Sequence, residues 1–229
     1  MKILSITTSS NVCAVAILED STLIKELQID DANTHSVKLM PLIRDLFLQT
    51  NLSVHDIDLF VCDKGPGSFT GIRIGISTIK AFEDVTKKLA LGISSLTSLA
   101  YSSKREGLIC SLIDAKHDNV YYSLYELKNG IYTQIGEFLA DTIFNITEIL
   151  KICNKPVLFV GNGSTIYKDM LKSSLNENAI FQDDVISISA YSTGLAGFAT
   201  FQKQENSPLQ PLYLKKSNAE REREEKSKC

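Results

Sequence analysis

The amino-acid sequence predicts an α/β protein built from two domains with the same order of elements. Short apolar, β-branched runs alternate with segments in which apolar residues recur every three or four positions, as in strands and amphipathic helices. The first half reads βββαβαβα, and the second half repeats this order. A length of 229 residues suits two domains of about 100 residues each. We place the domains at 1–103 and 104–207, with a tail at 208–229.

The first domain is expected to open with a three-stranded meander, because Ser, Asn, Asp and Glu residues separate its first apolar runs. A helix with one apolar face follows at 34–50. Pro41 lies inside this helix and either bends it or marks a start just before the proline. The expected elements are strands 2–8, 12–18, 22–29, 57–63 and 89–93, and helices 34–50, 70–87 and 95–103.

The second domain repeats the order of elements without a visible repeat of residues. Its expected elements are strands 107–114, 119–127, 130–138 and 156–161, a weak strand at 185–188, and helices 144–153, 164–175 and 189–203. The tail ends in a mixed-charge stretch at 217–226. That stretch is expected to be a solvated tail, with a docking arm for a partner as the alternative.

Composition narrows the class of protein. Hydrophobic residues make up 44% and charged residues 22% of the chain, which is ordinary for a globular protein. The apolar runs are shorter than the ~20 residues that cross a bilayer, and no basic leader precedes the first strand, so we expect a cytoplasmic protein. The five cysteines form no C-x-x-C pair and are expected to be reduced and structural. A net charge of −3 is not typical of an autonomous nucleic-acid binder.

A glycine-rich stretch at 64–75 joins a strand to a helix. Its turn contains Gly65, Pro66, Gly67, Ser68, Thr70 and Arg73. Glycine permits backbone angles that other residues avoid, Ser68 or Thr70 can cap the helix, and the free amides could hold an anion. The stretch nevertheless fails the dinucleotide and P-loop motifs, because Thr70 and Ile72-Arg73 stand where those motifs need Gly and Lys-Ser or Lys-Thr. The glycines at 67, 71 and 75 share one helix face, which favours close packing.

The segment GPGSFTGIRIGISTIKAF resembles the signature of the bacterial TsaB family, also called YeaZ, a partner subunit in tRNA threonylcarbamoyladenosine synthesis. The likeness covers nearly the whole chain, since shorter matches occur at 3–16, 34–43, 113–121 and 211–215. The resemblance implies two ribonuclease-H-like domains of the actin, sugar-kinase and heat-shock chaperone superfamily, each with a mixed sheet. A fold of this kind does not by itself assign a function.

The resemblance also points to a residual nucleotide site. Kinases and ATPases of this superfamily place a carboxylate near the first strand of each domain, where it positions a metal or a nucleophile. The matching positions here are Thr7 and Asp114, so the first carboxylate is missing. Asp114 either keeps a role or ties down a turn. Gly161 and Gly163 either let a nucleotide base approach or turn the chain.

The histidines predict no metal site. TsaD-like relatives carry a His-x-x-x-His pair on their first helix, but here His35 is followed four positions later by Leu39. His55 and His117 lie in separate predicted loops, so no ligand cluster is visible. We expect His35 to bond locally or to face a partner.

A partner surface is predicted on helices 34–50 and 70–87. The residues assigned to it are His35, Leu39, Met40, Ile43, Phe47, Gly71, Ile72 and Gly75. The first helix would supply apolar side chains and the second a groove at its glycines. The alternative is that both helices only cover their own sheet.

The function expected from the resemblance is that of a non-catalytic subunit supporting threonylcarbamoyl transfer to adenosine 37 of tRNA. Its expected partners are a TsaD-like catalytic subunit, a TsaE-like ATPase and a second copy of itself, with tRNA contacted only indirectly and no membrane. No cofactor is expected, except that an adenine nucleotide could bind at an interface shared with the partner. The alternatives are an ATPase or protease-like enzyme of the same superfamily, or a stand-alone tRNA-binding module.

Overall fold

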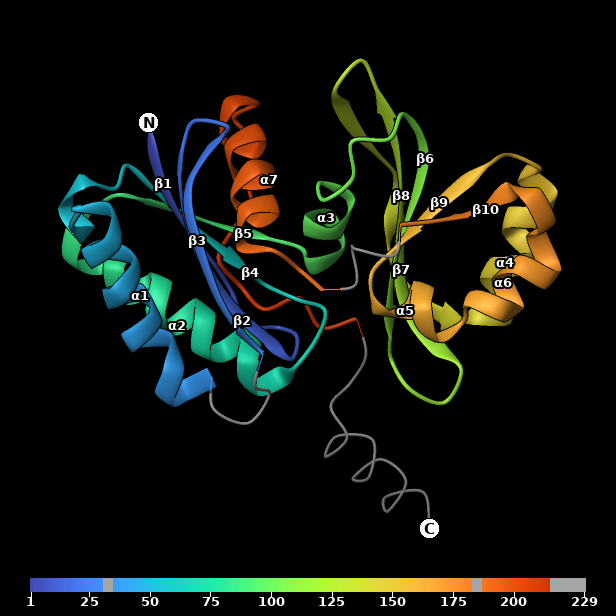
Figure 1. The fold of residues 1–229 in the computed structure, drawn as a ribbon, viewed down its shortest axis with the longest axis horizontal. Helices are drawn as coiled ribbons and strands as arrows, with labels where there is room; N and C mark the ends of the chain where they lie inside the picture. Colours follow the sequence, from blue (N-terminus) through green and yellow to red (C-terminus); the bar gives the residue numbers. More distant parts are fainter. Residues whose placement is uncertain (31–34, 183–186, 215–229) are drawn as a thin grey trace, which may run out of the picture.

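The computed structural model describes residues 1–30, 35–182 and 187–214, which form two α/β domains side by side (Figure 1). Each domain contains a five-stranded mixed sheet, ordered β3-β2-β1-β4-β5 in the first and β10-β9-β6-β7-β8 in the second. In both sheets the opening meander pairs antiparallel and the later strands join in parallel. The fold class predicted from the sequence is confirmed.

The strands match the expected runs closely. Those of the first sheet are β1 (Lys2–Thr7), β2 (Val12–Glu19), β3 (Thr22–Asp30), β4 (Leu59–Asp63) and β5 (Leu89–Ile93). Those of the second are β6 (Gly107–Asp114), β7 (Asn119–Lys128), β8 (Ile131–Thr142), β9 (Val157–Val160) and β10 (Ala179–Phe181). The predicted strand at 185–188 is replaced by β10, and part of that prediction lies outside the described residues.

The described helices also follow the predicted order. They are α1 (His35–Thr50), η1 (Val54–Asp56), α2 (Phe69–Thr86), α3 (Ser95–Ala100), α4 (Ile143–Cys153), α5 (Asn162–Ile166), α6 (Lys168–Leu175), η2 (Asn176–Asn178) and α7 (Ala190–Gln202). α1 runs through Pro41 as one helix. The single helix expected at 164–175 is instead two short helices that meet at Tyr167, whose φ of −103° and ψ of 17° are not helical.

The central strands β2, β1 and β4 of the first sheet are buried on both faces, whereas the edge strand β3 is largely exposed. Helices α1 and α2 cover one face, where Leu46 and Ile76 join the same core as Leu4. α7 covers the other face, where Ala196 packs with Leu59. This double cover explains why every residue from 12 to 18 in β2 is buried, since a strand enclosed by two layers has no solvent-facing side.

α7 belongs to the layers of the first sheet, although the sequence analysis placed residues 189–203 in the second domain. The chain returns from β10 to pack this helix on β1, β2 and β4. Small residues make the close approach possible: a Cβ at Gly194 would lie 2.6 Å from Leu18 Cδ1, and one at Gly197 would lie 2.5 Å from Val61 Cγ2. The first domain is therefore discontinuous in sequence.

α3 links the two domains. Leu99 and Ala100 pack with Ile109 and Tyr125 of the second sheet, whose other face is covered by α4 and α6. Figure 1 shows α3 beside α7 between the two sheets, and Thr193 of α7 donates a hydrogen bond of 2.9 Å to Ser98 Oγ. The domains therefore meet at α3, which packs on the second sheet and on α7.

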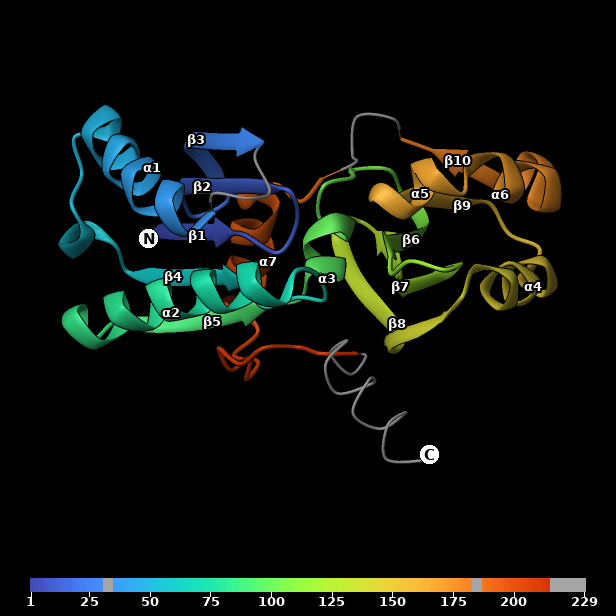
Figure 2. The same cartoon turned by 90° about the horizontal axis from the view of Figure 1, so that it is seen from below.

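The start of the predicted tail is packed rather than solvated. Leu209 is buried in the core beneath α1 and α2, and the Leu212 amide donates to the Lys64 carbonyl (2.8 Å). Figure 2 shows this segment running below β5. The mixed-charge stretch at 217–226 lies outside the described residues. Among the described helices, none combines the length and hydropathy needed to cross a bilayer.

Candidate functional site

The glycine-rich turn packs closely against the turn between β1 and β2. The Ser68 amide donates to the Ser9 carbonyl and the Thr8 hydroxyl donates to the Gly71 carbonyl, both at 2.7 Å. A Cβ at Gly67 or Gly71 would overlap the carbonyl oxygen of Ser9 or Thr8, respectively. Glycine is required at these positions because two backbones touch there.

The left-handed backbone of this turn is at Gly65, which has φ +97° and precedes Pro66 through a cis peptide bond. Gly67 is not among the described glycines with positive φ. The two glycines therefore have different uses: Gly65 turns the chain, and Gly67 leaves room for the β1–β2 turn.

Three amides of the turn, those of Gly65, Ser68 and Gly71, are occupied by acceptors within the chain. Ser68 is the N-cap of α2 and accepts from the Gly71 amide at 3.2 Å, while Thr70 is exposed. The Gly65 amide donates to the Asp63 carboxylate at 2.9 Å. A phosphate would have to compete with these contacts, so the geometry favours a structural joint over an anion cradle.

Part of the predicted partner surface is buried inside the chain. Gly71, Ile72 and Gly75 are all buried, and a Cβ at Gly75 would lie 2.6 Å from Thr8 Oγ1 and 3.0 Å from Cys62 Sγ. The close approach that Gly71 and Gly75 allow is made by Thr8 of the β1–β2 turn and by Cys62 of β4, in the same domain. The prediction of a partner groove at these three positions is therefore corrected.

Asp63 lies buried at the centre of the contact between the glycine-rich turn and the β1–β2 turn, which we call the joint. Its carboxylate accepts hydrogen bonds from the hydroxyls of Thr7 (2.9 Å), Ser95 (2.5 Å) and Ser9, and from the Gly65 amide (2.9 Å). Its side chain is fully buried. The residue thus ties the end of β1 to the start of α3 and to the glycine-rich turn.

The electrostatics of Asp63 combine two opposing causes. Burial raises the pKa of this carboxyl, and the four hydrogen bonds act against that rise. An ionised carboxylate has about four lone-pair sites, and four donors already occupy them. The sequence analysis missed Asp63, whose only local signal is an acidic residue directly after an apolar strand and before the glycine-rich turn.

Arg73 lies on the outside of the same joint. Its Nε donates to the Tyr213 hydroxyl at 3.1 Å, and the Tyr213 ring stacks on Phe69 with centroids 4.1 Å apart. The Arg73 guanidinium also lies 5.7 Å from the Phe69 ring centroid. These contacts hold the C-terminal run of the described chain against the first turn of α2.

Asp114 ties down the turn between β6 and β7. Its Oδ1 accepts from the Lys116 amide and from the Tyr167 hydroxyl, both at 3.1 Å, and its Oδ2 lies 3.0 Å from Lys116 Nζ. Lys116, His117 and Asp118 all have positive φ, so three residues in succession adopt the left-handed region. Of the two roles left open for Asp114, this geometry favours the structural one.

Gly161 and Gly163 pack against their own domain. Gly161 has φ +97°, and a Cβ there would lie 2.5 Å from the Leu112 carbonyl oxygen. A Cβ at Gly163 would lie 2.8 Å from Leu112 Cγ. Both glycines let the turn after β9 approach β6, which favours chain turning over contact with a base.

His35 is buried at the start of α1, and its Nε2 lies 2.8 Å from the carbonyl oxygen of Ser10. Ser10 is 25 positions earlier, so this contact is not the local bond expected from the sequence. Leu39 and Ile43 are also buried, so these three members of the predicted partner surface face the core. Across the described residues, no group of three or more His, Cys, Asp or Glu side chains is placed to hold a metal ion.

The outer side of α1 opens onto an apolar groove of about 510 Å³. Met40 and Phe47 of the predicted surface line it, together with Leu48 and with Phe82 from α2. Met40 is 52% and Leu48 68% exposed, and the two lie together in this groove. The exposed part of the predicted partner surface is therefore this groove.

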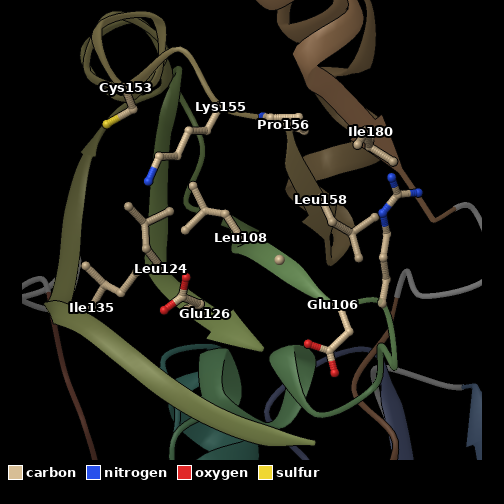
Figure 3. A pocket seen from close by; sticks show the side chains of 12 residues that line it. Glu106, Leu108, Leu124, Glu126, Ile135, Cys153, Lys155, Pro156, Leu158 and Ile180 are labelled. Atoms are coloured by element: carbon tan, nitrogen blue, oxygen red, sulfur yellow. The ribbon is translucent and has the colours of Figure 1, made fainter. Parts of the chain in front are cut away.

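A larger cavity of about 640 Å³ lies elsewhere in the described part of the chain. Figure 3 shows it where β6 and β9 begin, with Leu108, Leu124 and Ile135 on its floor and Lys155 and Glu126 at its edge. None of the residues predicted from the sequence lines this cavity, and Asp63 does not reach it.

Comparison with solved structures places the fold. A Pseudomonas aeruginosa protein described as similar to the peptidase YeaZ has a TM-score of 0.79 and 24% identity over 93% of this chain and 99% of its own. The activator of 2-hydroxyisocaproyl-CoA dehydratase from Clostridium difficile has a TM-score of 0.53 and 12% identity over 91% of this chain and 99% of its own. The chain thus shares the two-domain α/β fold of these proteins.

Sequence comparison gives the family. A family model described as TsaD, tRNA N6-adenosine threonylcarbamoyltransferase, matches residues 30–222. TsaB of Bacillus subtilis is 34% identical over 180 residues, which cover 76% of this chain and 77% of that protein. TsaB of Haemophilus influenzae is 26% identical over 235 residues and covers 94% of each chain. The chain belongs to the TsaB family of tRNA threonylcarbamoyladenosine biosynthesis proteins.

Proposed function

We propose that this chain is a non-catalytic partner subunit that supports a TsaD-like enzyme in transferring a threonylcarbamoyl group to adenosine 37 of tRNA. Its relatives are named for the biosynthesis of this modified nucleoside, and the matching family model is named for the transferase. Membership of the TsaB family supports a role in the biosynthesis of threonylcarbamoyladenosine in tRNA. The residues at the strand ends support the non-catalytic role.

The observation that carries this proposal is that donors within the chain already occupy the carboxylate oxygens of Asp63. At the end of β1, where superfamily enzymes carry a carboxylate, the chain has Thr7, and the Thr7 hydroxyl donates to Asp63. Asp63 is fully buried and accepts from four donors, so none of its lone pairs is directed at a substrate or a metal. Catalytic carboxylates need a free, accessible oxygen.

The partner surface in this proposal is the α1 groove lined by Met40, Phe47, Leu48 and Phe82. Exposed apolar patches rimmed by charged residues mark protein interfaces, and Arg44 lies at the edge of this one. A second copy of the chain would close a two-fold dimer there, and a TsaD-like subunit of similar fold would replace that copy. A TsaE-like ATPase would join this complex, with any adenine nucleotide held at a shared interface.

Contact with tRNA is assigned to the partner. The chain carries a net charge of −3, whereas tRNA binding draws much of its free energy from phosphate neutralisation by Lys and Arg. A gel shift at several salt concentrations tests this assignment. Tight, salt-dependent binding of tRNA by the purified chain alone would contradict it.

We predict that the purified chain with magnesium and ATP releases phosphate no faster than the buffer. The measurement is phosphate release by the parent and by Asp114→Ala, the variant that removes the carboxylate at the end of β6. A turnover that disappears in Asp114→Ala would show an ATPase, because a contaminating enzyme would not respond to that substitution.

Copurification tests whether a TsaD-like subunit binds this chain. A tagged copy expressed in its own organism is expected to retain a TsaD-like subunit in stoichiometric amount. The matched variant Met40→Glu places a charge in the α1 groove and is expected to release that subunit. Recovery of the chain without a TsaD-like protein, under salt conditions that preserve other complexes, would overturn the proposal.

A further inference from the structure

A polar cavity of about 470 Å³ lies between the two domains and is separate from the sites described above. On one side it is lined by Lys64, by Thr97 of α3 and by the residues that flank this helix, Ser94 and Tyr101; on the other side it is lined by β7 and β8. The segment after α7, which includes Ser207, closes a third side. Neither Thr7 nor Asp114 lines it, so it does not coincide with the strand ends where superfamily enzymes carry carboxylates.

Lys64 is held in a fixed orientation at this cavity. Its Cδ packs against Gly92, where an added Cβ would lie 2.9 Å from it, and its Nζ donates to Ser207 Oγ at 3.2 Å. The Ser207 hydroxyl donates in turn to the Gly92 carbonyl and can only accept from the lysine. Lys64 is half-buried, and this burial lowers the pKa of its ammonium group.

The charges around the cavity do not balance. The other lining cation, Lys203, lies 3.9 Å from the lining acid, Glu205. No carboxylate of the described residues pairs with Lys64. A partly buried cation whose one polar contact is a hydroxyl leaves room for an anion, because desolvating a charge is costly unless it is paired.

Tyrosines form a preorganised wall. Tyr101 and Tyr132, from opposite domains, stack with ring centroids 4.0 Å apart, and the Tyr132 hydroxyl donates to the Ser103 carbonyl. The Tyr125 hydroxyl lies 2.8 Å from Thr97 Oγ1. Burial raises the pKa of Tyr101 and of Tyr125 to about 12, so both rings stay neutral and do not repel an anion.

We propose that this interdomain cavity binds a small organic anion, whose phosphate or carboxylate pairs with Lys64 and whose body lies against the tyrosine wall. Its volume falls within the range of small-molecule pockets, about 300–1,000 Å³. The ligand would contact both domains next to the glycine-rich turn, since Lys64 follows Asp63 directly. The inference does not depend on the non-catalytic role proposed above.

The test is a titration of the isotope-labelled full chain, monitored by amide resonances. Its probes are AMP as the organic phosphate, 4-hydroxybenzoate as the organic carboxylate, inorganic phosphate, and uncharged adenosine. We expect AMP or 4-hydroxybenzoate to give saturable shifts at residues 94–101 and 125–134, and to bind more tightly than inorganic phosphate. The probe that binds distinguishes the phosphate from the carboxylate. Shifts with none of the anions, equal shifts with adenosine, or shifts located elsewhere would overturn the proposal.

Two matched variants test whether Lys64 pairs with the bound anion. Lys64→Met keeps the length of the side chain and is expected to weaken binding about tenfold or more, whereas Lys203→Met, which removes the paired lysine, should change it less than about threefold. Equal affinity of Lys64→Met and the parent would overturn the proposal. Should Lys64→Met not fold, a salt titration of the parent decides, because binding unchanged between about 0.05 and 0.5 M salt would exclude a charge-paired anion.

Discussion

Asp63 joins three segments that are distant in sequence, through Thr7 and Ser9, Gly65, and Ser95. Asparagine has nearly the same shape but turns one accepting oxygen into a donor that faces other donors. We therefore expect Asp63→Asn to lower the free energy of unfolding by about 2–3 kcal/mol. Urea denaturation measures this.

The control for this substitution is Asp84→Asn, which changes an exposed acid on α2 and should shift stability by less than about 0.5 kcal/mol. If the two variants were equally stable, the buried hydrogen bonds of Asp63 would contribute nothing to the joint.

The pH dependence of stability provides a second test of Asp63. Burial raises its folded-state pKa above the unfolded value of 3.8. The folded state therefore keeps a proton over a pH range in which the unfolded chain has lost it, and stability falls as pH rises through that range. The stability of the parent relative to Asp63→Asn should decrease from about pH 4 toward neutrality. A difference that grows with pH would contradict the raised pKa.

At Gly75, tertiary packing is expected to outweigh the helix propensity that normally favours alanine over glycine. Alanine is normally preferred to glycine inside a helix by up to about 1 kcal/mol. At Gly75, however, the added Cβ would lie 2.6 Å from Thr8 Oγ1. We expect Gly75→Ala to destabilise the chain by about 1–3 kcal/mol in thermal or urea melts. Ser77→Ala, on the exposed side of the same helix, is the matched control and should be neutral or stabilising. A Gly75→Ala variant that melts above the parent would show that the contact relaxes freely.

At the scale of the element, α1 has two different faces. Leu39, Ile43 and Leu46 are buried against the sheet, while Met40 and Leu48 line or border the outer groove. Burial of a few aliphatic side chains at the centre of an interface can supply most of its binding free energy.

We accordingly predict that Met40→Glu and Leu48→Glu each weaken self-association or binding of a TsaD-like subunit by about tenfold or more. Gln49→Glu adds the same charge on α1 outside the groove and should leave association unchanged. Light scattering and copurification measure the effect, with circular dichroism to confirm that the variants fold. Unchanged assembly of both groove variants would locate the interface elsewhere.

At the scale of the whole molecule, α7 makes the first domain depend on residues that follow the second. Without α7, the face of the first sheet that includes Ile3, Leu59 and Val61 would meet water. Each exposed aliphatic side chain costs about 1.5–3 kcal/mol, so several of them approach the total stability of a domain, about 5–15 kcal/mol.

We predict that residues 1–103 expressed alone do not reach a native fold and give poorly dispersed amide resonances. Joining 187–214 to 1–103 through a flexible linker should restore dispersion, because it returns α7 and the segment containing Leu209 to the sheet. A well-dispersed spectrum of 1–103 alone would show that α7 is dispensable.

The sequence by itself determined the types, the order and nearly all the bounds of the elements, because these follow from local periodicity and turn residues. It also located the glycine-rich turn between β4 and α2. Its errors were of a different kind. The break at Tyr167 and the place of β10 depend on how short segments pack, which a periodicity of few residues does not encode.

Only the tertiary structure decided what each predicted residue contacts. The glycines at 67, 71 and 75 were recognised as a close-packing face, but their neighbour proved to be the chain's own β1–β2 turn rather than a partner. The carboxylate of Asp63 gains most of its hydrogen-bond donors only in the folded chain. Folding brings Ser9 and Thr7, which are 54 and 56 positions before it, together with Ser95, which is 32 positions after it. Contacts between distant segments, such as that of α7 with the first sheet, arise from the global path of the chain, and a single sequence carries no local signal of that path.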